Sequence, residues 1–228
     1  MAKFMWKATI YKEWIKIRWV TLIFTLIGLA AVGNIFLKVR HEFVFNEASV
    51  YWYNILFQND QFFNYGLFKF VPALGALAIA LAQFFPETVN KRIKLTFHLP
   101  LNENRSLLQM IAFGTVCLLA TYMVILILFT GLSFWFFPVE IIGKTFISIA
   151  PWFMGGFVVY YLVALIVLEP IWKYRFLYFI ASATFLPVYF EKAKFEGYAP
   201  AIPIVLLFAV LLSFSPLFSG YRFRKGEM

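Results

Sequence analysis

The sequence predicts an all-α membrane protein with six transmembrane helices, and three observations lead to this fold class. Apolar residues make up 63% of the 228 residues and charged residues only 14%, which is far outside the composition of a soluble domain. Six apolar stretches approach or reach the length that crosses a hydrocarbon core of about 30 Å. Little sequence separates these stretches, so we expect one membrane domain over residues 1–228 and no soluble domain.

Residues 1–18 have the pattern of an amphipathic helix that lies along the cytoplasmic face of the membrane. At about 100° per residue, Thr9, Lys12, Glu13 and Lys16 form one narrow polar stripe, and aromatic and aliphatic residues occupy much of the remaining surface. A simple membrane anchor is the alternative. The candidate functional residues of this helix are Phe4, Lys7, Tyr11, Lys12, Trp14 and Lys16.

The six predicted spans follow from hydropathy along the chain. They are residues 19–37, 68–85, 107–128, 147–168, 176–189 and 201–218. Together they form a bundle over residues 19–218, and residues 219–228 are a short tail. The fifth span is short and contains Pro187, so we expect it to tilt little, to break, or to leave the membrane partway.

Two further segments have patterns of their own. The second span has a face of small residues that allows another helix to approach closely, as in a dimer interface or the wall of a transport pathway. These residues are Ala73, Gly75, Ala76 and Ala80. The aromatic-rich segment 51–66 predicts an interfacial helix under the outer leaflet, with a substrate-contacting rim as the alternative.

Basic residues predict the orientation in the membrane. With both termini in the cytoplasm, fourteen of the twenty Lys and Arg residues fall on the cytoplasmic side, as the positive-inside rule requires. The net charge of +9 is then explained by the loops between spans and not by a nucleic-acid-binding surface. We expect a multi-pass protein of the inner (cytoplasmic) membrane, with membrane lipids as partners and no nucleic acid.

The chain is poor in the residue clusters that a membrane enzyme needs. His41 and His98 fall on opposite sides of the predicted topology, so they cannot share a metal, and the carboxylates are scattered with none in mid-span. The Gly-Lys-Thr sequence at 143–145 matches the end of a phosphate-binding loop, but Pro138 occupies the place of the required earlier glycine. We expect no catalytic residue, no metal site and no cofactor bound by this chain.

The segment 87–105, ETVNKRIKLTFHLPLNENR, is unusually charged for so apolar a chain. A basic cluster is followed by apolar residues, of which Phe97 and Leu99 are the main ones. An exposed apolar face next to the membrane needs a cover, and a soluble partner supplies one. Alternatively, the basic residues only bind anionic headgroups, at ~1 kcal/mol each, which leaves the apolar residues unexplained. The candidate contact residues are Glu87, Lys91, Arg92, Ile93, Lys94, Leu95, Phe97, His98, Leu99, Pro100 and Leu101.

The N-terminal helix with its YKEWIKIR sequence, the six spans and the LTFHLPLNENR segment together resemble the membrane subunit of ABC-2 type transporters, the permease of an ABC exporter. The resemblance covers the whole chain in topology, but its specific motif is confined to residues 87–105. There the family pattern LLxLPLSR appears as LTFHLPLNENR. Residues 191–200 are too few for the re-entrant half-helices that many members carry before the last span, which leaves the outer gate undefined.

The resemblance implies roles for several segments. Residues 93–99 would be a coupling helix that docks on a separate ATPase subunit, and Glu87 would match the glutamate that ends the family's second span. Residues 3–18 would be a connecting helix beside the ATPase, and residues 172–175 a minor contact. Pro100 and Leu101 would shape the exit of the coupling helix.

The function implied is transport by a pair of permeases, either two copies of this chain or this chain and a paralogue. Two ABC ATPase subunits would bind ATP and Mg, and this chain would not itself be an enzyme. Apolar, aromatic spans favour a hydrophobic or amphiphilic substrate. The alternative is a non-transporting membrane anchor or scaffold for a cytoplasmic ATPase or other machinery.

Overall fold

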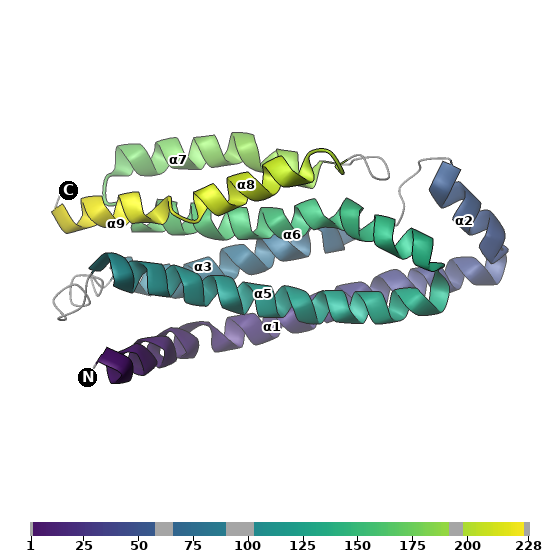
Figure 1. The fold of residues 1–228 in the computed structure, drawn as a ribbon, viewed down its shortest axis with the longest axis horizontal. Coiled ribbons are helices and arrows are strands. Elements are labelled where there is room, and N and C mark those ends of the chain that lie inside the picture. Colours follow the sequence, from purple (N-terminus) through teal and green to yellow (C-terminus); the bar gives the residue numbers. More distant parts are fainter. Residues whose placement is uncertain (1, 58–65, 90–102, 192–197, 226–228) are drawn as a thin grey trace.

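The computed structural model describes residues 2–57, 66–89, 103–191 and 198–225. Within these ranges the secondary structure is helical, with short turns between helices, and most of the helices lie side by side along one long axis (Figure 1). Both termini lie at the same end of this bundle (Figure 1). We call this the terminal end, and the opposite end, which carries α2 (Ala48–Phe57), the distal end.

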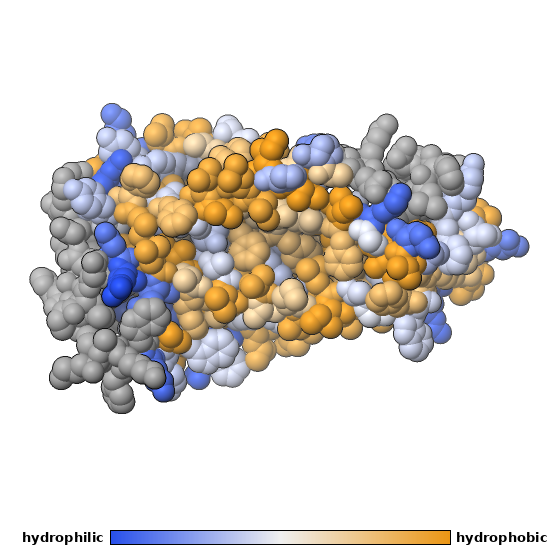
Figure 2. Space-filling model, viewed as in Figure 1, coloured by the Kyte–Doolittle hydropathy of each residue, from blue (hydrophilic) through white to orange (hydrophobic). Residues whose placement is uncertain are grey.

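Five helical segments of the described chain are long and apolar enough to cross a membrane. They are Lys7–Phe45, Phe68–Val89, Asn104–Phe136, Val139–Leu168 and Ile202–Arg222. Figure 2 shows an apolar surface over the middle of the bundle, with hydrophilic residues mainly toward its two ends. The prediction of an all-α, multi-pass membrane protein is therefore confirmed.

The first helix differs from the prediction. α1 (Ala2–Phe45) runs without interruption for 44 residues, or about 66 Å at 1.5 Å per residue, so no break separates the predicted interfacial helix from the first span. Residues 2–27 contain neither Gly nor Pro, and without such a residue nothing in the sequence ends the helix.

The predicted fifth span also differs from the others. It corresponds to α7 (Trp172–Phe185) and the 3₁₀ helix η2 (Leu186–Phe190). The 14 residues of α7 cover about 21 Å, less than the hydrocarbon core, so this segment is not among the five long helices. Pro187 lies within η2, where the α-helix has already given way to the 3₁₀ helix.

The centre of the bundle is α6 (Val139–Leu168), which packs against α3 (Val71–Val89), α5 (Glu103–Phe136), α7 and η2, α8 (Ile202–Leu212) and α9 (Pro216–Lys225). α1 packs against α3 and α5 on the other side. The 3₁₀ helix η1 (Gly66–Phe70) leads into α3. Aromatic rings fill the core between these helices, with Phe68 of η1 between Phe129 and Phe153.

The small-residue face of α3 packs inside this chain. Ala76 and Ala80 are fully buried, and Phe24 of α1 lies 3.3 Å from the place that a Cβ of Gly75 would occupy. Ala73 is partly buried against the core. Ala76 and Ala80 therefore have no exposed surface to offer a second copy of the chain.

Candidate polar network at the terminal end

The terminal end brings together the first half of α1, the end of α3, the start of α5 and the end of α6 (Figure 1). Six polar side chains connect these helices: Lys12, Glu13, Lys16, Gln83, Glu87 and Tyr160. We call them the Glu87 network.

Ion pairs form one half of the Glu87 network. Oε1 of Glu87 accepts hydrogen bonds from Nζ of Lys12 at 2.8 Å and Nζ of Lys16 at 2.6 Å. The same Lys16 ammonium donates to Oε1 of Glu13 at 2.6 Å. Both carboxylates are only 1% exposed, and burying an ionised carboxylate is costly unless it is paired. Two lysines and two glutamates leave this half without net charge.

The second half of the network passes through the amide of Gln83. Its Nε2 donates to Oε2 of Glu13 at 3.1 Å and to the backbone carbonyl of Met110 in α5 at 2.8 Å. Its Oε1 accepts a hydrogen bond from the hydroxyl of Tyr160 in α6 at 2.7 Å. Gln83 and Tyr160 are fully buried. Hydrogen bonds thus connect all four helices, from the half-exposed Lys12 to the centre of the bundle.

The hydrogen bond between Tyr160 and Gln83 requires α5 to pack closely against both side chains at Gly114. A Cβ on Gly114 would collide with the hydroxyl of Tyr160 and with Oε1 of Gln83. Glycine at this position therefore leaves the space in which Tyr160 and Gln83 meet.

Helical spacing explains why these side chains face one another. Lys12 and Lys16 are four residues apart on α1, and Gln83 and Glu87 are four residues apart on α3, so each pair lies on one face of its helix. Where α1 crosses α3, the two faces meet. The polar stripe of the N-terminal segment is thus directed into the bundle at Glu13 and Lys16, and not toward the cytoplasm as the interfacial helix would require.

One atom of the network has no partner. Oε2 of Glu87 is buried and has no hydrogen-bond partner in the part of the chain that the structure describes. Glu87 lies three residues before segment 90–102, which the structure does not describe.

A third buried carboxylate, that of Glu169, joins the end of α6 to the C-terminal helix α9. Glu169 is fully buried, and its carboxylate accepts hydrogen bonds from Ser219 Oγ at 2.7 Å and from Arg222 Nη1 at 3.4 Å, both on α9. Its backbone carbonyl accepts a hydrogen bond from Arg175 Nη2 of α7 at 2.7 Å. The guanidinium of Arg222 also lies 4.2 Å from the ring centroid of Tyr174.

At the distal end, two tyrosines have raised pKa values. Burial raises the pKa of Tyr51 in α2, and the negative charge of Glu42 adds to the effect. Burial likewise raises the pKa of Tyr198, with a smaller contribution from Glu191. The Tyr198 hydroxyl donates to the carbonyl of Val188 at 2.9 Å. Both phenols are therefore neutral hydrogen-bonding groups near pH 7.

Most of the predicted partner-binding residues lie outside the described residues. These are Lys91, Arg92, Ile93, Lys94, Leu95, Phe97, His98, Leu99, Pro100 and Leu101. The side chain of Phe4 is likewise not described. On α1, Lys7, Tyr11 and Trp14 are exposed, whereas Lys12 and Lys16 take part in the Glu87 network.

Sequence reasoning missed Gln83, Tyr160 and the buried position of Glu13. The expectation of scattered carboxylates does not hold for Glu87, because Glu87 and Glu13 accept hydrogen bonds from the same lysine. A signal was present: Gln83 is a lone polar residue inside an apolar span, and such residues usually find a partner inside the protein.

The charges of the Glu87 network neutralise one another. Every charge of the Glu87 network is paired, and among the described residues no group of three or more His, Cys, Asp or Glu could hold a metal ion. The arrangement can hold four helix ends in a fixed relationship.

The fold and the Glu87 network together define a multi-pass helical membrane protein whose helix ends are joined by buried charges. No protein-family profile, curated protein or solved structure matches the chain.

Proposed function

We propose that this chain is the permease subunit of an ATP-driven ABC exporter. The observation that carries the proposal is the ion pairing of Glu87 with Lys12 and Lys16. It joins the end of α3, which leads into the proposed coupling segment, to the first half of α1, the proposed connecting helix. The ABC-2 resemblance assigns both segments to the surface that meets the ATPase.

The proposed mechanism uses this connection to transmit movement. When the ATPases bind ATP and close, the coupling segment moves with them and carries Glu87. Because Lys16 pairs with both Glu87 and Glu13, the first half of α1 follows. α1 continues as one helix to Phe45, so its displacement reaches the distal end as a rigid-body tilt.

The other components of the transporter would be separate polypeptides. Two ATPase subunits bind ATP and Mg, and two permeases, either identical or this chain with a paralogue, enclose the pathway. This chain supplies no catalytic group. Its apolar, aromatic helices favour a hydrophobic or amphiphilic substrate taken from the bilayer.

Both termini belong on the cytoplasmic side in this proposal. Their common position at the terminal end (Figure 1) is compatible with an even number of crossings. α7 and η2 together supply the sixth crossing, at about 21 Å and about 10 Å of helix respectively.

The test starts from the ATP-binding protein that co-purifies with the tagged wild-type chain from native membranes, identified by mass spectrometry. Phe97→Asp and Leu99→Asp should abolish co-purification, whereas Lys144→Asp at the distal end should not. Lys16→Met should retain the ATPase but lose substrate-stimulated ATP hydrolysis. Normal export by a Phe97→Asp complex would refute the proposal, and binding without any substrate-stimulated hydrolysis in the wild type would favour the scaffold.

A further inference from the structure

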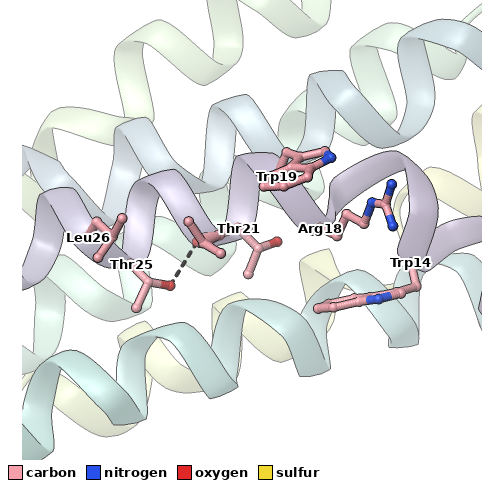
Figure 3. Close-up of a pocket in the computed structure, with 7 residues that line it drawn as sticks. Trp14, Arg18, Trp19, Thr21, Thr25 and Leu26 are labelled. Carbon is pink, nitrogen blue, oxygen red and sulfur yellow. Dashed lines mark hydrogen bonds between the residues drawn. The ribbon is translucent and has the colours of Figure 1, made fainter.

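A shallow groove of about 440 Å³ runs along the outside of α1, separate from the Glu87 network. Its lining residues are Trp14, Arg18, Trp19, Thr21, Leu22, Thr25 and Leu26. Figure 3 shows that the two indoles and the guanidinium occupy one end, while Thr25 and Leu26 lie further along the helix. The hydroxyl of Thr25 donates to the carbonyl of Thr21 at 2.7 Å, which leaves little polar surface in this part of the groove.

Arg18 is the cation of the groove, and it differs from the neighbouring lysines. Lys12 and Lys16 are neutralised by Glu87 and Glu13. Arg18 is exposed, and no carboxylate of the described residues forms an ion pair with it. Its guanidinium lies 5.5 Å from the ring centroid of Trp19, within the range of a cation–π contact. An anion that approaches Arg18 therefore displaces no carboxylate of the described residues.

The length of the groove and the change from charged to apolar residues along it match one leaflet of a bilayer. Arg18 lies nearer the N-terminus of α1, and Leu22 and Leu26 follow it about one and two helical turns further toward the middle of the bundle. From Arg18 to Leu26 the helix rises by about 12 Å, compared with about 15 Å for half of a hydrocarbon core. Trp14 and Trp19 lie beside the charge, and indoles favour the interface between membrane and water.

We propose that this groove binds one anionic phospholipid. Its phosphate pairs with the guanidinium of Arg18, and one acyl chain lies along Leu22 and Leu26. The site depends only on α1 and is independent of the proposed transport function. A basic group at one end and an apolar lining over the rest complement a negatively charged amphiphile in both charge and polarity.

The test measures lipid binding to the delipidated, detergent-solubilised full chain by native mass spectrometry. Phosphatidylglycerol is the probe and phosphatidylcholine is the neutral comparison. The wild type should bind phosphatidylglycerol more tightly. Arg18→Gln should weaken that binding about fivefold, the effect of one basic residue near an anionic surface. Leu26→Trp, which fills the groove, should also weaken it.

A matched control variant distinguishes binding in the groove from general attraction of an anionic lipid to basic residues. Lys173→Gln removes an exposed cation beside a tryptophan at the same end of the bundle, and it should leave binding unchanged. Equal binding of the two lipids, or no effect of Arg18→Gln, would overturn the proposal. A loss in Arg18→Gln without a loss in Leu26→Trp would also overturn it, because attraction to the headgroup would then need no groove. Exposed Arg18 and Leu26 tolerate these changes, and melting temperatures check that the variants fold.

Discussion

Lys16 of α1 and Glu87 of α3 form an ion pair of 2.6 Å although they are 71 positions apart in the sequence. Lys16 also pairs with Glu13, so its single ammonium lies between two buried carboxylates. Without this ammonium, two like charges would face each other in a space with little water. Lys12, the other lysine on Glu87, contacts only that one carboxylate and is 43% exposed.

Lys16→Met should therefore destabilise the protein much more than Lys12→Met. Breaking a buried pair leaves an uncompensated charge, and we expect a loss of about 3 kcal/mol. Lys12→Met should cost less than about 1 kcal/mol, because an exposed pair is screened by water. Denaturant unfolding in detergent measures both values. Equal losses for the two variants would contradict the central role given to Lys16.

Gly114→Ala should disrupt the second half of the Glu87 network. The added methyl group would collide with the Tyr160 hydroxyl and the Gln83 amide oxygen, and we expect a loss of about 1–3 kcal/mol from overpacking. Gly131→Ala, on the same helix, is the matched control, because nothing lies within 4 Å of its Cβ position. There alanine should be neutral or should stabilise the helix by up to about 1 kcal/mol. Thermal unfolding of the two variants gives the comparison.

The helices could be predicted from the sequence because their signals are local. Apolar stretches predict six membrane-spanning helices, and five of them correspond to the long apolar helices of the described chain. The absence of Gly and Pro before Gly28 is a local sign that α1 does not break. The polar stripe of residues 1–18 nevertheless predicts a separate interfacial helix, because a polar stripe is expected to face water. A hydropathy pattern reports that a stripe is polar, but not whether water or another protein segment satisfies it.

The polar network could not be predicted, because it depends on contacts between distant parts of the chain. Glu13 and Gln83 are 70 positions apart, and only the packing of α1 on α3 brings them together. The predicted partner-binding segment, residues 87–105, is described by the structure only at residues 87–89 and 103–105. Glu87 is described, and its ion-pair partners Lys12 and Lys16 belong to the N-terminal segment, residues 1–18, which the sequence also indicates as functional.

Ser219→Ala should loosen the C-terminal helix. Ser219 donates a hydrogen bond to the fully buried carboxylate of Glu169, and losing a hydrogen bond to a charged group costs about 1.5–3 kcal/mol. Amide hydrogen exchange in α9 should then accelerate by about tenfold or more. Ser213→Ala should leave α9 unchanged, because that hydroxyl donates only to the carbonyl of Val210 in its own helix turn. Faster exchange throughout the bundle, including α5, would mean that Glu169 supports the whole fold and not the attachment of α9.

Residues 173 and 191 should be accessible from opposite sides of the membrane. α7 alone covers about 21 Å and η2 adds about 10 Å, which together match a hydrocarbon core of about 30 Å. In a Cys117→Ser background, Lys173→Cys should react with a membrane-impermeant maleimide only from the cytoplasmic side, like Lys7→Cys. Glu191→Cys should react only from the outside, like Lys144→Cys. If Glu191→Cys reacts from the cytoplasmic side, α7 and η2 turn back within the membrane. The last helical segment, Ile202–Arg222, would then start on the cytoplasmic side and end on the outside. The assignment of both termini to the cytoplasm would be wrong.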